Sequence, residues 1–188
     1  RNSDRHSPVM RVFIGLLAVS TLILVATALS KMALYINAYG LTRLRVYASW
    51  FMILIAAGFL IALIKEIAPR FNAVCALLAV FVLLFGALAL SDPDRIIAEY
   101  NVDRYIAGTL GLDVETLSNE YSDSAIPALV RLRTALEDRP DTENFKKIID
   151  RRLDVWQRTN GDPAKNIFCE TLPRIRARRA VHGMLTED

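Results

Sequence analysis

Hydrophobic positions are concentrated in the first half of the chain, in three apolar stretches of about twenty residues each. They cover residues 12–30, 46–64 and 71–90, and short charged loops separate them. A helix of about twenty residues, rising 1.5 Å per residue, spans the hydrocarbon core of a bilayer, which is about 30 Å thick. Because lipid offers no hydrogen bonds to the backbone, such segments must be helical. The pattern predicts an integral membrane protein with three transmembrane helices.

The second half of the chain shows apolar positions at helical spacing and no alternation typical of strands. Its apolar faces lie in residues 96–106, 129–136 and 145–156. Helix starts are expected at Asp92-Pro93, near Val114, near Ser122 or Asp123, at Asp141, at Asp162-Pro163 and after Pro173. The predicted fold class is all-α: three transmembrane helices followed by a small soluble helical bundle.

Charge changes at the same boundary. Residues 1–90 carry eight basic and two acidic side chains, a net of +6, whereas residues 91–188 carry fifteen and eighteen, a net of −3. We therefore predict a membrane domain of residues 1–90 and a soluble helical domain of residues 91–188. Five basic residues flank the helices on each side, so the positive-inside rule does not decide which side the soluble domain faces.

The excess of positive charge indicates a lipid partner and no nucleic acid. Most of it flanks the apolar stretches, where Lys and Arg meet headgroups. The one concentrated cluster is formed by Arg174, Arg176, Arg178 and Arg179. We expect it to be a solvated or headgroup-facing helix, with a nucleic-acid patch as the alternative.

Residues that carry chemistry are sparse. His6 and His182 lie far apart, and Cys75 and Cys169 lie in different halves, so neither a metal site nor a catalytic triad nor a disulfide is expected. No glycine-rich phosphate loop is present in the sequence. We expect no cofactor and no catalytic residue. The acidic residues Asp92, Asp123, Asp141 and Asp162 are interpreted as helix caps.

A first polar cluster follows the first apolar stretch. Lys31, Tyr35 and Tyr39 recur every fourth residue, which places them on one helix face as an interfacial anchor; the alternative is that Lys31 is a buried charge. Gly40 then breaks the helix. The following residues are either a glycine turn with snorkelling arginines or a contact for a headgroup or a partner. The candidate contact residues are Lys31, Tyr39, Gly40, Thr42, Arg43 and Arg45.

A second polar cluster lies just beyond the third apolar stretch, in residues 99–104. It is either a helix surface with intrahelical pairs, such as Glu99 with Arg104, or a junction. In the junction hypothesis, Asn101 and Arg104 dock the bundle onto the membrane loops.

These two clusters carry a family resemblance. Residues 34–42 (LYINAYGLT) with Arg45, residues 94–104 (DRIIAEYNVDR) and the segment from Leu112 to Leu129 resemble bacterial multi-pass membrane proteins catalogued as domains of unknown function four-one-seven-three and four-one-five-three. The similarity runs over residues 29–136. It implies further spans upstream, a bacterial inner-membrane location and no established activity. The stretch SDSAIPAL departs from the Ser-x-Asp-Ala-x-Pro pattern expected of that family.

Three functions are compatible with these features. The first hypothesis is a non-enzymatic scaffold, sensor or regulatory module that contacts lipid and a membrane-protein partner. The second is a transporter whose remaining spans lie upstream, which a polar inner face on the first two spans would favour. The third is a membrane-surface enzyme acting on lipid-linked substrates, which a carboxylate pair in a surface cleft would favour.

Overall fold

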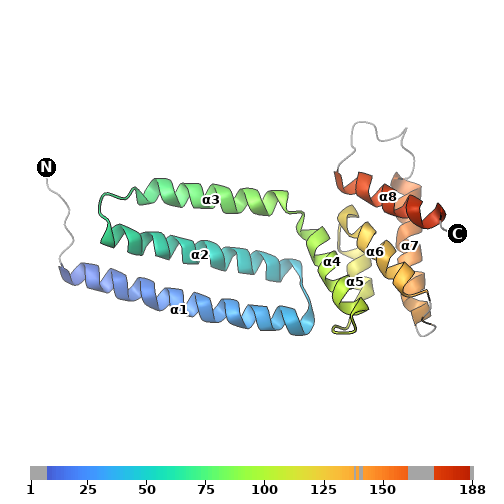
Figure 1. The fold of residues 1–188 in the computed structure, drawn as a ribbon, viewed down its shortest axis with the longest axis horizontal. Coiled ribbons are helices and arrows are strands. Elements are labelled where there is room, and N and C mark those ends of the chain that lie inside the picture. Colours follow the sequence, from blue (N-terminus) through green and yellow to red (C-terminus); the bar gives the residue numbers. More distant parts are fainter. Residues whose placement is uncertain (1–7, 138, 140–141, 161–171, 187–188) are drawn as a thin grey trace. The chain divides into compact units, whose positions relative to one another are not determined.

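The computed structural model describes residues 8–137, 139, 142–160 and 172–186, and within them it contains helices and no strand. The all-α prediction is confirmed. The chain divides into two compact units: Arg1–Ala38 with Thr42–Ser91, and Tyr39–Leu41 with Asp92–Asp188 (Figure 1). The short link between the first two helices therefore belongs to the second unit, which the hydrophobic pattern did not indicate.

The first unit consists of three long apolar helices that run side by side in alternating directions. These are α1 (Pro8–Tyr39), α2 (Arg43–Ile67) and α3 (Ala73–Leu90). All three are long and apolar enough to cross a membrane, and almost none of their residues is buried inside the protein. Such exposed apolar side chains are favourable in contact with lipid or with further apolar helices. The prediction of three membrane-compatible helices is confirmed.

Polar side chains complete the ends of these helices. Thr42 caps α2, where its hydroxyl oxygen accepts a hydrogen bond from the Arg45 N–H at 3.4 Å, and Asn72 caps α3 by accepting from the Cys75 N–H at 3.3 Å. The Lys65 ammonium donates to the carbonyl oxygens of Pro69 and Phe71, at 2.9 and 2.8 Å. The two caps satisfy N–H groups that the first turns of α2 and α3 leave unpaired, and Lys65 joins the end of α2 to the connection that follows it.

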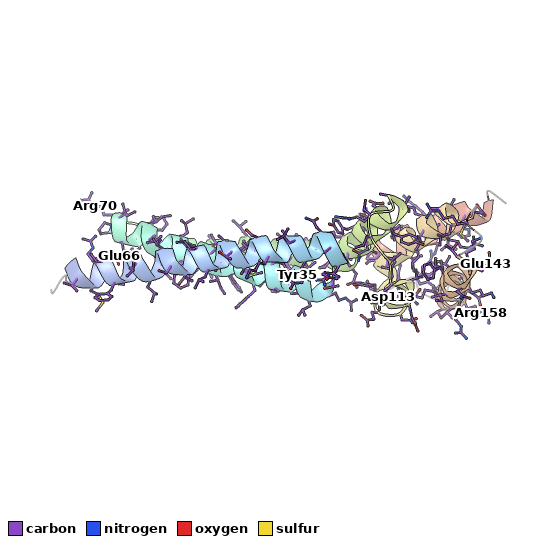
Figure 2. All side chains as sticks on the ribbon, turned by 90° about the horizontal axis from the view of Figure 1, so that it is seen from below. Tyr35, Glu66, Arg70, Asp113, Glu143 and Arg158 are labelled. Atoms are coloured by element: carbon purple, nitrogen blue, oxygen red, sulfur yellow. The ribbon has the colours of Figure 1, made fainter. Side chains whose placement is uncertain are left out.

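Two polar contacts hold the three helices to one another. The Trp50 indole N–H donates to the Leu84 carbonyl at 2.9 Å and joins α2 to α3. At the other end of α2, the Arg11 guanidinium of α1 pairs with the Glu66 carboxylate at 3.1 Å; Figure 2 labels Glu66 at this end of α2 and Tyr35 far from it along α1. In a low-dielectric surrounding such directed contacts define the helix register.

The second unit is built around one hydrophobic core. Its elements are α4 (Pro93–Ile106), α5 (Val114–Asn119), the 3₁₀ turn η1 (Asp123–Ala125), α6 (Ile126–Ala135), α7 (Glu143–Asn160) and α8 (Leu172–Thr186). Helix α6 packs against α4, α7 and α8. Its Leu129 and Leu132 are buried, as are Ile97 of α4 and Trp156 of α7. The predicted helical faces therefore meet in a common core.

One predicted cap, Asp92, is confirmed in position only, and a second, Asp123, is wrong. Asp92 occupies the N-cap position of α4, but its φ of 50° is left-handed and its side chain makes no cap hydrogen bond, since capping requires an extended residue. The Asp123 carboxylate instead pairs with Arg174. Asp113, which was not predicted as a cap, caps α5. Asp141 and Asp162 lie outside the described residues.

The helix predicted from Ser122 or Asp123 to Asp138 is divided into η1 and α6. Pro127 lies in the first turn of α6, where its missing N–H and its ring are tolerated, so a new helix begins there.

Candidate functional site

Asn101 of α4 and the backbone of Leu41 form a reciprocal pair of hydrogen bonds. The Asn101 side-chain oxygen accepts from the Leu41 N–H at 2.8 Å, and its amide nitrogen donates to the Leu41 carbonyl at 2.8 Å. One amide thus satisfies both backbone groups of a residue 60 positions away. We call this contact the Asn101 clasp. It lies within the second unit, to which Tyr39–Leu41 belong.

Gly40 makes the clasp sterically possible. Its φ of +79° is left-handed, a backbone conformation that residues other than glycine adopt only at a cost in free energy. A Cβ built on Gly40 would lie 2.7 Å from the Asn101 side-chain oxygen and 2.9 Å from the Leu110 Cδ2. Glycine is therefore required here both by the turn and by the close approach of Asn101.

Arg104 supports the end of the same helix. Its guanidinium donates to the Tyr100 hydroxyl at 3.1 Å and lies 5.7 Å from the centre of that ring. It also donates to the Thr109 hydroxyl at 3.3 Å, and this hydroxyl donates to the Arg104 carbonyl at 3.0 Å. These contacts fasten α4 to the turn that follows it.

The intrahelical pair of Glu99 with Arg104 was predicted wrongly. Glu99 pairs with Arg95 at 2.8 Å, because residues four apart face each other on a helix whereas residues five apart do not.

The other predicted contact residues lie around the α1–α2 link. Lys31 and Tyr39 are exposed on α1, and Thr42 caps α2. Arg43 and Arg45 are half-buried in the first turn of α2. The structure joins Gly40 and Asn101 directly, whereas Lys31 lies in the first unit and the clasp in the second.

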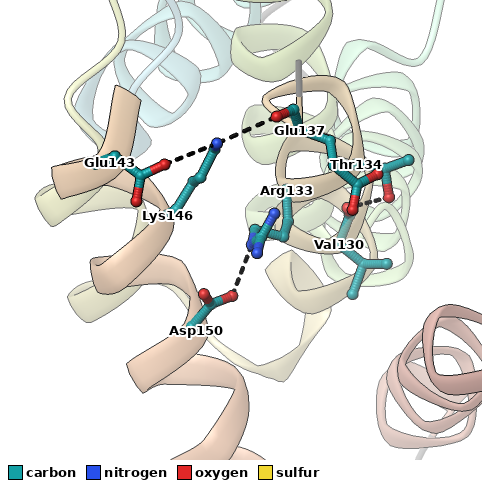
Figure 3. A network of polar contacts seen from close by, with 7 residues as sticks. All are labelled: Val130, Arg133, Thr134, Glu137, Glu143, Lys146 and Asp150. Carbon is teal, nitrogen blue, oxygen red and sulfur yellow. Dashed lines mark hydrogen bonds and ion pairs between the residues drawn. The ribbon is translucent and has the colours of Figure 1, made fainter. Parts of the chain in front are cut away.

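A polar network between α6 and α7 was not predicted. Arg133 pairs with Asp150 at 2.8 Å, and the Lys146 ammonium contacts the Glu143 carboxylate at 3.0 Å and donates to the Glu137 carbonyl at 3.2 Å (Figure 3). The hydrogen bond and positive charge of Lys146 lower the pKa of Glu143. The three-residue spacing of Glu143 and Lys146 is a local signal, but the pairing of Arg133 with Asp150 depends on how α6 meets α7.

A cleft between α5 and α7 was also missed. Its volume is about 470 Å³, and three of its lining side chains are basic. The lining residues are Glu115, Ser118, Asn119, Lys147, Ile148, Arg151, Arg152 and Val155. The useful sequence signal is the recurrence of basic residues at one-turn spacing on an otherwise amphipathic helix. In the portion of the chain with defined placement, no group of three His, Cys, Asp or Glu side chains is arranged to hold a metal ion.

Comparison with known proteins identifies a family for most of the chain. A family model described as "Domain of unknown function (DUF4153)" matches residues 1–132. The match covers α1, α2 and α3 and extends into α6, so it includes the Asn101 clasp. No curated protein and no solved structure matches the chain.

Proposed function

Because the chain belongs to the DUF4153 family and has three membrane-compatible helices, we propose that it is part of a bacterial inner-membrane protein with a non-enzymatic regulatory role. In this role the second unit acts as a sensor or scaffold. Its state is communicated to α1 and α2 through the link between them.

The Asn101 clasp is the observation that carries this proposal. Residues Tyr39–Leu41 continue directly into α1 on one side and, through Thr42, into α2 on the other. Asn101 satisfies both backbone groups of Leu41 and closes over Gly40. A displacement of α4 within the second unit therefore acts on both membrane helices through the covalent chain. A single amide with two hydrogen bonds is an element that opens or closes as a whole.

Polar side chains of α1 support a scaffold role over transport. The hydroxyls of Thr21, Thr27 and Ser30 donate to carbonyls of their own helix, one turn earlier, at 2.8–2.9 Å. These hydroxyls are satisfied within their own helix, which favours a scaffold role over a polar pathway between helices.

The partners proposed for this module are the bilayer, further spans of the same protein and a membrane-protein partner. The exposed apolar side chains of α1, α2 and α3 suit the first two. The residues proposed to contact headgroups or the partner are Lys31, Tyr39, Thr42, Arg43 and Arg45. Their ammonium, guanidinium and hydroxyl groups suit phosphate and carboxylate oxygens.

Hydrogen exchange on the full chain in lipid nanodiscs tests the coupling. Asn101→Ala removes both hydrogen bonds of the clasp, and Gln157→Ala removes an exposed amide of α7 as a matched control. We expect Asn101→Ala to accelerate exchange both in residues 39–47 and in α4, and Gln157→Ala to change neither. Unchanged exchange in residues 39–47 of Asn101→Ala would show that the clasp transmits nothing to the helix ends.

Recovery of partners from native membranes tests the role itself. A protein that co-purifies in stoichiometric amount with the wild type and with Gln157→Ala, and is lost from Asn101→Ala, supports a regulatory module. Equal recovery with all three forms contradicts a role for the clasp in regulation.

A further inference from the structure

Basic side chains outnumber acidic ones in the lining of the cleft between α5 and α7. Lys147, Arg151 and Arg152 line it from α7, and Glu115 contributes one negative charge from α5. Lys147 and Arg151 have no hydrogen-bond or ion-pair partner among residues whose placement is described. Arg152 lies 3.9 Å from the Asp123 carboxylate, at the outer limit of an ion pair. The cleft therefore attracts an anion.

Ser118 of α5 is a second residue of interest in the lining of the cleft. Ser118 is 1% exposed, and its hydroxyl oxygen has no hydrogen-bond partner in the described parts of the chain. Buried hydroxyls are normally paired, so an unpaired hydroxyl on a residue that lines a cleft indicates a missing hydrogen-bond partner.

The size and polarity of the cleft indicate which class of ligand it can hold. The volume of about 470 Å³ falls in the range of small-molecule sites, about 300–1,000 Å³, and exceeds what one inorganic phosphate fills. Ile148 and Val155 supply apolar wall beside the basic groups. Arginine and lysine together are the side chains that bind phosphate oxygens best.

We propose that the cleft between α5 and α7 binds a small phosphate-bearing anion through Lys147, Arg151 and Arg152, with the Ser118 hydroxyl as an additional donor. This site is independent of the Asn101 clasp and goes beyond the regulatory role proposed above. A soluble organic phosphate and a lipid headgroup share this chemistry.

Calorimetric titration of the full chain in phosphatidylcholine nanodiscs, with pyrophosphate as the probe, tests the proposal. We expect saturable binding that weakens by about tenfold or more in the double variant Lys147→Gln with Arg151→Gln. Arg158→Gln is the matched control, because Arg158 lies on the same helix, is largely exposed and pairs with Asp154 outside the cleft; Figure 2 labels it. An absence of saturable binding, or an equal loss in Arg158→Gln, would overturn the site.

Ser118→Ala separates a ligand-binding hydroxyl from a merely unsatisfied one. If the hydroxyl binds the anion, we expect pyrophosphate affinity to fall by about threefold to tenfold. Unchanged affinity together with a more stable protein would remove Ser118 from the site. Circular dichroism of every variant checks that the helices are retained.

The same titration in nanodiscs containing phosphatidylglycerol distinguishes the two sources of phosphate. If pyrophosphate binds with the same affinity in these nanodiscs, the ligand is a soluble phosphate. If phosphatidylglycerol weakens pyrophosphate binding by competition, and this weakening disappears in the Lys147→Gln, Arg151→Gln variant, the ligand is a lipid headgroup. Weakening that persists in this double variant contradicts headgroup binding in the cleft.

Discussion

At the level of single residues, the contact between Gly40 and Asn101 leaves no space for a larger side chain. Gly108 offers a comparison within the same unit, since its φ of +71° is also left-handed but a Cβ there would meet nothing within 4 Å. The two glycines therefore separate the cost of backbone conformation from the cost of steric overlap.

We predict that Gly40→Ala lowers the free energy of unfolding of the second unit by about 2–3 kcal/mol, and Gly108→Ala by about 1 kcal/mol. The measurement is denaturation of the full chain in detergent, followed by Trp156 fluorescence. A Trp50→Phe background makes the buried Trp156 the only indole, because the chain has two tryptophans. Equal losses of unfolding free energy in the two variants would show that the Asn101 side chain moves to make room for the added methyl group.

Asp113 provides a pH-dependent contribution at the same scale. Hydrogen bonds from the N–H and the hydroxyl of Thr116, at 3.0 and 2.8 Å, lower the pKa of Asp113 below its ordinary value of 3.8. A carboxylate whose pKa is lower in the folded state stabilises the fold above its unfolded pKa. That stabilisation is lost as pH falls through the folded pKa.

Asp113→Asn keeps a cap acceptor but does not titrate. We expect the stability advantage of wild type over Asp113→Asn to shrink as pH is lowered from about 5 to about 3. The Trp156 denaturation assay measures it. A difference that stays constant over this range would contradict the lowered pKa.

At the level of elements, Asp123 joins three segments that the sequence separates widely. Its carboxylate lies on η1, accepts a hydrogen bond from Arg174 of α8 at 3.2 Å and lies 3.9 Å from Arg152 of α7. The Asp123 side chain is only 24% exposed, so this pair is less screened by water than a surface ion pair. We interpret Asp123 as the residue that holds α8 on the core.

Asp123→Asn should loosen α8 without unfolding α6. We expect hydrogen exchange in residues 172–186 to accelerate, corresponding to a local loss of about 1 kcal/mol. Asp154→Asn, which breaks a more exposed pair with Arg158 at 2.8 Å, is the control and should leave α8 unchanged. Identical exchange in the two variants would assign α8 docking to apolar contacts such as those of the buried Ala177 and Val181.

At the level of the whole molecule, we expect membrane insertion and the proposed partner contact to depend on different residues. Insertion depends on the apolar surface of α1, α2 and α3, whereas Thr42 and Arg45 contribute a cap and a charge at one end of α2.

The double variant Thr42→Ala with Arg45→Ala should therefore remain in the membrane after alkaline carbonate extraction and yet lose partner recovery. Arg70→Ala is the control, because Arg70 lies in the α2–α3 connection, at the far end of α2 from Arg45. Loss of the double variant from the membrane would contradict this division of roles, and unchanged partner recovery would reduce residues 39–45 to a turn.

The sequence by itself determined three features of the protein: the presence of three helices apolar enough for a membrane, the fold class and most helix ends. Long apolar runs have no stable alternative to helices in lipid, and Gly40 and Pro93 act on the backbone locally, so no tertiary information was needed to place these boundaries. The sequence was less decisive for the carboxylates. Aspartate is a residue type typical of helix caps, but the backbone conformation of Asp92 and the ion-pair partner of Asp123 decide what these two residues do.

Only the tertiary structure decided which polar groups from distant segments meet. The pairing of Asn101 with Leu41, the ion pair of Asp123 with Arg174 and the basic cleft between α5 and α7 all join segments far apart in the chain. Neither hydrophobic periodicity nor residue type encodes such a pairing, because both describe one element at a time. A hydrogen bond forms only where packing brings a donor within about 3 Å of an acceptor.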